Sequence, residues 1–481
     1  MPASQSSIDA LLYPMNSIIS VWNTSTAPAY NFTYQFAGAS QPGDLWAGFS
    51  GWTAFTDPAK RAALVSVLDE YEEIINVTFT EVTGQADPDI NFGLVSLNGG
   101  QGGFNYSYST SNGQVVSRTY DAFAVFGSTI DLTTPDGRNL LLHEIGHALS
   151  LKHPGAYDVG GNIPPPPYLP TAEDNNKYSV MSYNVNPDNG LDSDHLMLYD
   201  IAALQARWGA NLSTRTGNDT YTAPAGRMQV IWAAGGTDTI AASAQSPTVR
   251  IDLRPSHYSA IGRTTDNLAV AFDVSVGGSV VNYIENATGG SANDTIYGNE
   301  IANVLRGQSG NDRMNGFGGA DNLNGGAGND TLFGSLGYDK VYGGTGIDSL
   351  YGDGGNDTLY GGGGNDRMNG GVGRDTFVFN TALNASTNRD TILDFSHVDD
   401  TIRLTHDVFS AVSTGALTAD AFYVVGSGAP RDAEDRIFYN PTTGVLSYDA
   451  DGNAAGGVAA IQFAVLRGAP ADLSFDDFIV V

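Results

Sequence analysis

A nine-residue periodicity in the second half of the chain constrains its fold more than any other feature. Aspartate recurs at this spacing from Asp294 to Asp375, and Asn303 fills the single missing place. An apolar residue stands two positions after each member, and from position 298 to 370 a glycine stands four positions after each acid. A flexible glycine-rich linker would not keep acid and apolar residue in phase over ten units. The pattern therefore predicts a repeat architecture.

The repeat also predicts a cation. Each unit supplies a glycine turn and a short strand, so that two units make one 18-residue coil of a parallel β-roll. Acids in successive coils then stack about 4.8 Å apart, and a column of bare carboxylates would repel itself. Calcium takes roughly six to eight oxygen ligands and fits between turns, where carboxylates and turn carbonyls meet. We expect several structural calcium ions on these residues: Gly326, Gly328, Asp330, Gly337, Asp339, Gly344, Gly346, Asp348, Gly355, Asp357, Gly362, Gly364, Asp366, Gly371, Gly373 and Asp375, with Asp312 and Asp321 in the earlier turns.

The region before the repeats has a different character. Up to about residue 211 apolar runs alternate with turns, which indicates an α/β domain. Asp57 and Pro58 are typical of a helix start, and Leu64, Val67, Leu68, Tyr71 and Ile75 follow at helical spacing. A second helix begins at Thr134 and Pro135, and a third ends before Gly209. We expect two domains, residues 1–211 and 212–481.

Composition narrows the possible partners. The formal net charge is −30, from 52 acidic and 22 basic residues, which argues against nucleic acid or an anionic membrane as partner. There is no cysteine, so any metal must be held by histidine, carboxylate, tyrosine or backbone oxygen. No run of about 20 apolar residues occurs, and the first residues lack the pattern of a signal peptide, so we expect no membrane anchor.

The stretch HEIGHALSLKH, residues 143–153, predicts a catalytic zinc site. His143 and His147 lie four residues apart on one helix and project from one face, with Glu144 beside them and His153 as third ligand. Three neutral imidazoles leave zinc an open position, which lowers the pKa of bound water toward about 7. Glu144 would take the proton of that water as it attacks a peptide carbonyl and pass it to the leaving amine. This predicts a zinc endopeptidase.

Residues 143–154 resemble the metzincin signature, and YSVMSYN downstream resembles the Met-turn of that clan. By this resemblance Met181 lies beneath the metal, and Tyr183 is a further zinc ligand. Position 150 is serine where the metzincin pattern has glycine. We expect a positive φ there, at a cost of roughly 1 kcal/mol over glycine, with zinc binding retained.

Together, the zinc motif, the tyrosine after the Met-turn, the absence of cysteine and the repeats, which resemble RTX calcium-binding repeats, are similar to the serralysins. The resemblance implies a metzincin-type α/β zinc protease domain followed by an all-β RTX parallel β-roll domain. It implies a secreted, extracellular monomer that cleaves proteins and peptides with broad specificity. It also implies type I secretion through a C-terminal signal, here FDDFIVV, and a periplasmic proteinaceous inhibitor.

Two further expectations follow from that resemblance. Metzincins bind peptide along a sheet edge above the zinc, and GGFNYSYS from Gly102 is the candidate edge strand. Relatives also suggest an additional calcium site at Arg215, Asp219, Gly236 and Asp238, which local departures from the family pattern weaken.

Two alternatives remain open from sequence. An RTX surface or adhesion protein with an inactive protease-like domain would explain the repeats and the acidity, and a zinc hydrolase of a non-peptide bond would keep the zinc motif. A casein assay with and without a zinc chelator separates the first alternative from an endopeptidase.

Overall fold

The computed structural model describes residues 4–13, 30–46, 48–111, 114–157, 164–190, 193–223, 227–262, 265–276, 279–428, 431–452 and 459–481, with side chains left undescribed at 106–118 and 276. The chain forms two compact units. The first comprises Met1–Asn218, Ala223–Gly236 and Thr264–Asn282, and the second comprises Asp219–Thr222, Thr237–Arg263 and Tyr283–Val481. The first unit therefore includes two segments that lie beyond residue 211.

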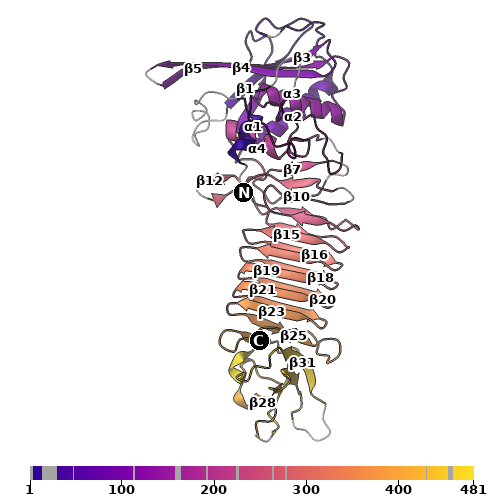
Figure 1. Cartoon of the computed structure of the whole chain (residues 1–481), viewed down its shortest axis with the longest axis vertical. Coiled ribbons are helices and arrows are strands. Elements are labelled where there is room, and N and C mark those ends of the chain that lie inside the picture. Colours follow the sequence, from indigo (N-terminus) through magenta and orange to yellow (C-terminus); the bar gives the residue numbers. More distant parts are fainter. Residues whose placement is uncertain are drawn as a thin grey trace. The chain divides into compact units, whose positions relative to one another are not determined.

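A five-stranded sheet forms one layer of the first unit (Figure 1). Its order is β2 (Val77–Glu81), β1 (Tyr30–Phe36), β3 (Ile90–Val95), β5 (Gln114–Gly127) and β4 (Gly100–Ser111). The first four strands pair in parallel, and β4 pairs antiparallel with β5. The stretch from Gly102 thus lies on an edge strand, because β4 is the last strand in this order.

Among the described residues, four α-helices accompany this sheet: α1 (Gln5–Leu11), α2 (Pro58–Ile74), α3 (Pro135–Ala148) and α4 (Leu198–Trp208). Asp57 caps α2 and Thr134 caps α3, each with a proline in the first turn, and Gly209 ends α4 with a φ of 80°. The caps are those expected from sequence, because a side-chain oxygen there satisfies backbone N–H groups that the helix leaves unpaired. Short strands complete the unit: β7 (Gln229–Ile231), β11 (Leu268–Val270), β12 (Ser275–Val276) and β13 (Ser279–Val280).

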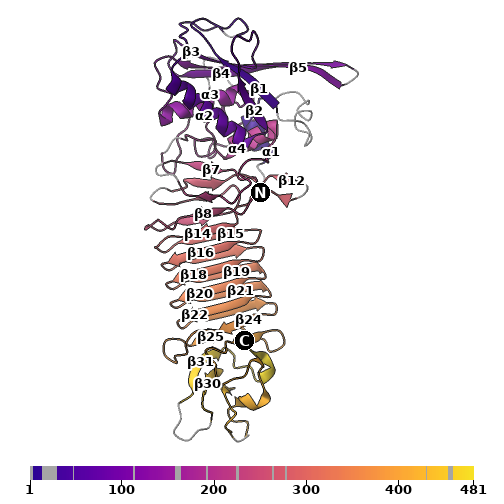
Figure 2. The same ribbon diagram turned by 180° about the vertical axis from the view of Figure 1, so that it is seen from behind.

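The second unit is a β-roll of two eleven-stranded sheets, with strands stacked as rungs (Figures 1 and 2). One sheet contains β6 (Thr220–Tyr221), β8 (Thr239–Ala241), β14 (Asn286–Thr288), β16 (Val304–Ser309), β18 (Asn322–Ala327), β20 (Lys340–Thr345), β22 (Thr358–Gly363), β24 (Thr376–Phe379), β26 (Thr401–Leu404), β32 (Phe478–Val480) and β27 (Gly415–Ala416). The other contains β9 (Arg250–Asp252), β15 (Thr295–Asn299), β17 (Arg313–Phe317), β19 (Thr331–Gly337), β21 (Ser349–Gly355), β23 (Arg367–Val372), β25 (Asp390–Ile392), β31 (Ile461–Leu466), β30 (Val445–Tyr448), β29 (Ile437–Asn440) and β28 (Phe422–Val424). Outside these sheets lie β10 (Tyr258–Ser259) and the short 3₁₀ helices η2 (Ala419–Ala421) and η3 (Phe475–Asp477).

The register of the roll confirms the 18-residue coil. Met314 pairs with Leu332, Leu332 with Leu350, and Leu350 with Met368, each in a parallel ladder. The apolar residue of every repeat is fully buried, so two files of side chains, one from each sheet, fill the thin interior. After Met368 the coil becomes longer than 18 residues, because Met368 pairs with Ile392, and the regular repeat ends at this point.

The C-terminal stretch FDDFIVV contributes η3 and β32, and β32 pairs with β26 in the roll. Among the helices in the described part of the chain, none has the length and apolarity to cross a membrane.

Candidate metal centre

Three histidines converge at the end of α3. His143 and His147 lie on the helix, and His153 follows the bend after it. Nε2 of His153 lies 3.1 Å from Nε2 of His143 and 3.0 Å from Nε2 of His147. All three rings are buried, and together they could hold a metal ion.

Backbone carbonyls fix the tautomer of two of these rings. Nδ1 of His143 donates to the Val180 carbonyl, and Nδ1 of His147 donates to the Leu151 carbonyl, both at 2.9 Å. Because the proton sits on Nδ1, Nε2 of each ring presents a lone pair toward His153. One proton could bridge only one of these close contacts, whereas a cation would satisfy all three nitrogens. The carbonyls of Val180 and Leu151 carry no signal in the sequence, and sequence reasoning missed them.

Burial keeps the three rings neutral. Burial is the main reason why the pKa of each ring is lowered. The neighbouring imidazoles lower the pKa of His147 and His153 further, and the pKa of His153 falls to about 3. Neutral rings are the form that binds a metal ion.

The side chain of Glu144, on α3, lies against the edge strand β4. Its carboxylate accepts a hydrogen bond from the Gly102 N–H, and burial raises its pKa to about 8. A Cβ at Gly100 would lie 2.6 Å from Glu144 Cγ, and one at Gly102 would lie 2.0 Å from the Glu144 carbonyl oxygen. Only glycine at these positions lets β4 approach α3 so closely. A positive charge beside this carboxylate would lower its pKa and favour the ionised base.

The segment around Met181 packs against α3. Met181 is fully buried, and a Cβ at Gly146 would lie 2.8 Å from its sulfur. Asp200, on α4, accepts hydrogen bonds from the Ser179 hydroxyl and the Val180 N–H, at 2.6 and 2.8 Å. Asp200 therefore fixes the carbonyl that orients His143, a role that the sequence did not reveal.

Tyr183 lies over two of the histidines. Its ring centroid is 4.7 Å from that of His153 and 5.5 Å from that of His143, on which it stacks. The side chain is 55 % exposed, and partial burial raises its pKa to about 12. Tyr157 packs against Tyr183 at 5.1 Å and donates to Asp174, which also accepts from Ser182.

Ser150 has the positive φ expected from sequence, at 78°. The residue is fully buried, and its hydroxyl has no hydrogen-bond partner among the described residues.

The aspartates of the roll form two columns. From Asp312 to Asp375, Oδ1 of each acid accepts the N–H of the residue one coil earlier in the register, which is Asn303 for Asp321 and an aspartate for the others. Asp330 accepts from Asp312 at 2.7 Å, and Asp348 accepts from Asp330 at 2.8 Å. Oδ2 is buried and has no hydrogen-bond partner in the described part of the chain at these residues: Asp312, Asp321, Asp330, Asp339, Asp348, Asp357, Asp366 and Asp375. A row of such oxygens suits a cation.

Asn303, which takes the place of one aspartate in the register, differs from the aspartates in its hydrogen bonding. Nδ2 of Asn303 donates to the Glu285 carbonyl and to Asn299 Oδ1, so its amide is satisfied by the protein alone. The ten glycines predicted to supply carbonyls have φ values from 96° to 156°, a region that favours glycine.

The residues of the weaker predicted calcium site lie partly in each unit. Within the first unit, Arg215 pairs with Glu73, and a Cβ at Gly236 would lie 1.9 Å from the Gly217 carbonyl oxygen. Within the second unit, Asp238 Oδ1 accepts the Asp219 N–H at 2.7 Å.

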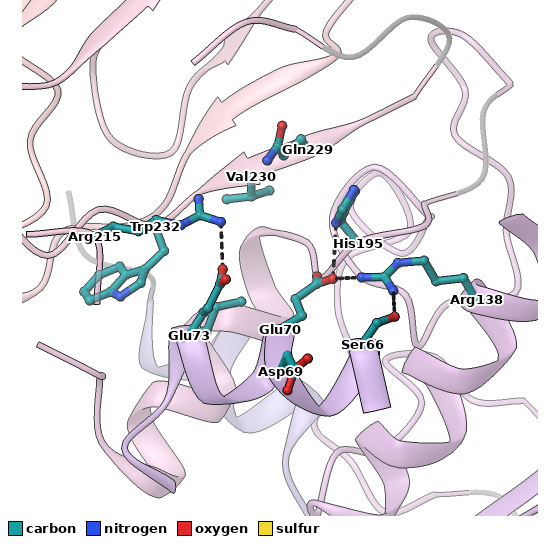
Figure 3. A pocket seen from close by; sticks show the side chains of 11 residues that line it. Ser66, Asp69, Glu70, Glu73, Arg138, His195, Arg215, Gln229, Val230 and Trp232 are labelled. Atoms are coloured by element: carbon teal, nitrogen blue, oxygen red, sulfur yellow. Dashed lines mark hydrogen bonds and ion pairs between the residues drawn. The ribbon is translucent and has the colours of Figure 1, made fainter. Parts of the chain in front are cut away.

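A separate cavity of about 220 Å³ in the first unit shares no residue with the triad (Figure 3). Glu70 in its wall pairs with Arg138 and His195, and Glu73 pairs with Arg215. Two of the three acidic side chains in this wall, Glu70 and Glu73, are therefore paired with cationic side chains of the same wall.

These features define a β-roll protein with a three-histidine metal site. The family model described as "Peptidase M10 serralysin C terminal" matches residues 208–425. Serralysin from Proteus mirabilis is 31 % identical over 347 residues, which cover 59 % of this chain and 68 % of that protein. Metallopeptidase AprA from Pseudomonas marginalis is 35 % identical over 289 residues, which cover 54 % and 58 %. Serralysin C from Dickeya chrysanthemi is 34 % identical over 303 residues, which cover 57 % and 60 %.

The chain belongs to the serralysin family of metalloproteases. It spans about 60 % of the length of several of these relatives. Among solved structures, extracellular lipase LipA from Serratia marcescens aligns over 41 % of this chain and 40 % of that chain, with 16 % identity and a TM-score of 0.16, which supports no structural argument.

Proposed function

We propose that the chain is a secreted zinc endopeptidase with a metzincin-type catalytic domain, and that it cleaves peptide bonds in extracellular proteins. The observation that carries this proposal is the meeting of three histidine Nε2 atoms beside a buried glutamate at an open sheet edge.

His143, His147 and His153 would hold the zinc ion, and the phenol of Tyr183 is positioned beside two of them. When bound, zinc supplies a Lewis acid and lowers the pKa of a coordinated water toward about 7. The carbonyls of Val180 and Leu151 keep two of the rings in the tautomer that binding requires.

Glu144 would act as general base. Its carboxylate takes a proton from the attacking water and then delivers that proton to the departing amine nitrogen. The hydrogen bond from Gly102 N–H orients this carboxylate, and burial excludes bulk water from it. A residue in this role contributes about 10²- to 10⁴-fold to the rate.

The edge of β4 would bind the substrate as an added strand. Backbone pairing of this kind reads little side-chain information, so we expect broad specificity. Protein and peptide substrates are the partners that this edge suits.

The aspartate columns of the roll would bind several calcium ions. In a calcium-poor cytosol the columns repel and the roll cannot order, so the chain stays competent for type I export, with the C-terminal stretch as its signal. Outside the cell, calcium would drive folding. A proteinaceous periplasmic inhibitor would protect the producing cell.

The test is Glu144→Ala, assayed on casein with and without a zinc chelator. We expect casein cleavage to fall at least 10²-fold, by the contribution typical of a general base, while zinc and calcium contents stay unchanged. Glu434→Ala, at an exposed glutamate in the second unit, is the matched control and should keep full activity. Full activity in Glu144→Ala would contradict its role as general base, whereas no casein cleavage by the parent protein with zinc bound would favour an RTX binding protein instead.

A further inference from the structure

A network of hydrogen bonds holds the backbone of Tyr183. Tyr157 donates its hydroxyl proton to Asp174 Oδ1, and the Ser182 hydroxyl donates to the same oxygen at 2.8 Å. The Tyr157 oxygen accepts one hydrogen bond from the Tyr183 N–H and another, at 3.0 Å, from Asn184 Nδ2. The hydroxyl of Tyr157 therefore joins the carboxylate of Asp174 to the backbone of Tyr183.

Asn184 holds the chain immediately after Tyr183. Its N–H donates to Ser182 Oγ at 3.1 Å, its Nδ2 donates to the Asp174 carbonyl at 2.8 Å, and its carbonyl accepts the Asn176 N–H at 2.8 Å. The residues on both sides of Tyr183 are thus bonded to Asp174, so the backbone has little freedom to turn at Tyr183.

Asp174 is itself fixed by close packing. The residue is buried, and its N–H donates to the Pro170 carbonyl at 3.0 Å. A Cβ at Gly155 would lie 2.4 Å from Asp174 Oδ2, so only glycine lets the chain just after His153 approach this carboxylate. Asp174 is therefore a fixed point for the network, close to the segment that carries the third histidine.

The side chain of Tyr183 is held less firmly than its backbone. It is 55 % exposed, and its ring contacts those of His143, His153 and Tyr157. Among the described residues, its hydroxyl has no hydrogen-bond partner. The backbone at residue 183 therefore largely determines where the phenol lies. Because the phenol oxygen is at the far end of the side chain, a small turn of that backbone moves the oxygen further than it moves the Cα.

We propose that Tyr157 is a positioning residue for Tyr183, and that Asp174 and Asn184 hold the Tyr157 hydroxyl in place. The inference rests on the proposed function, in which the phenol of Tyr183 acts beside the zinc ion. The hydroxyl of Tyr157 acts through the backbone of Tyr183 rather than on the substrate. A misplacement of about 1 Å at a reacting site costs about 10²-fold in rate, so a backbone brace of this kind affects catalysis.

The test is Tyr157→Phe, which removes the hydroxyl and keeps the ring that packs on Tyr183. We expect kcat on a fluorogenic peptide to fall about tenfold, with little change in KM or zinc content, because the reacting geometry changes and the three imidazoles stay in place. The amide of Tyr183 should exchange with deuterium about tenfold faster, because its hydrogen-bond partner is lost. Tyr168→Phe is the matched control: it removes a hydroxyl that donates to the Pro164 carbonyl outside this network, and it should change neither kcat nor this exchange rate.

A double-mutant cycle separates positioning from a general effect on the fold. In a Tyr183→Phe background, which lacks the phenol, Tyr157→Phe should cause no further loss of kcat. Asn184→Ala is a second variant, at an exposed residue, and it removes one of the hydrogen bonds to the Tyr157 oxygen. We expect this variant to lower kcat less than Tyr157→Phe does, and again only when the phenol of Tyr183 is present.

Three results would overturn the inference while leaving the protease intact. Equal losses of kcat from Tyr157→Phe in both backgrounds would show that its hydroxyl acts through the fold. Unchanged exchange of the Tyr183 amide would show that this hydrogen bond does not hold the backbone, and full activity in Tyr183→Phe would show that the phenol needs no positioning. No cleavage of any peptide by the parent protein would instead overturn the proposed function, and this inference with it.

Discussion

Ser150 combines two unfavourable features at one position. Its φ of 78° lies in the left-handed region, and its buried hydroxyl has no hydrogen-bond partner among the described residues. The bend at Ser150 leads the chain from α3 to His153, so the strain lies in the connection between two of the three histidines.

We expect Ser150→Gly to raise the free energy of unfolding by about 1 kcal/mol, because glycine adopts this φ without a steric penalty. Zinc content should stay the same. Ser150→Ala is the control, since it removes the hydroxyl and keeps the strained φ. Urea unfolding measures the effect, and equal stability of the glycine variant and the parent would contradict the argument from strain.

His195 pairs with Glu70, and the effect of this pair on stability can be measured. Its Nδ1 lies 3.2 Å from Glu70 Oε2, and Arg138 pairs with the same carboxylate. Burial is the largest influence on each group and opposes its charge, but the pairing prevails, so the pKa of His195 is raised and that of Glu70 is lowered. The folded protein therefore binds the imidazole proton more tightly than the unfolded chain does.

We expect His195→Gln to lower the free energy of unfolding by about 1.5–3 kcal/mol near pH 5.5, the value of a hydrogen bond to a charged group. The loss should shrink as pH rises through the raised pKa of His195, because the parent loses the same proton there. His257→Gln, at a histidine in the second unit, is the control. A loss that does not change between pH 5.5 and 9 would show that charge pairing is not its cause.

Among the elements, the aspartate column permits the sharpest test of calcium binding. Asp348 accepts the Asp330 N–H through Oδ1, while Oδ2 has no partner in the described part of the chain. Asparagine at this position keeps the backbone acceptor and removes the charge. We expect Asp348→Asn to reduce the calcium-induced rise in Tm, by about 2–4 °C per kcal/mol of binding lost.

The same variant should be at least as stable as the parent in a chelator, because it relieves repulsion within the column. Asp420→Asn, at an exposed residue outside the column, should change neither value. An unchanged calcium response in Asp348→Asn would contradict the assignment.

The stability of the calcium-free roll should also depend on pH. Burial raises the pKa of Asp312, Asp321, Asp348 and Asp357 to about 7. The roll should therefore lose stability as pH rises from about 4 to 7, because its acids stabilise the fold only while protonated.

Elements with a strong local signal were predictable from sequence. The caps at Asp57 and Thr134 and the 18-residue register of the roll are confirmed, since a cap or a repeat is determined by residues close together in the chain. The approach of Gly102 to Glu144 and the bonds from Val180 and Leu151 to the histidines were not predictable. They depend on backbone groups, or on how segments distant in sequence pack, and residue types do not encode these.

For the molecule as a whole, the net charge of −30 and the two aspartate columns have one physical consequence. Binding of divalent cations reduces the repulsion between the carboxylates and at the same time orders the roll. We therefore expect the second unit to require calcium in order to fold. Family membership supports a metalloprotease, and we propose that the three-histidine centre carries its chemistry.

The most direct measurement combines metal analysis of fully active protein with X-ray absorption at the zinc edge. We expect one zinc ion per chain, with three imidazole nitrogens at about 2.0–2.1 Å, and activity lost and regained in proportion to zinc removed and restored. Fully active protein without a transition metal, or zinc bound without imidazole ligands, would contradict the account.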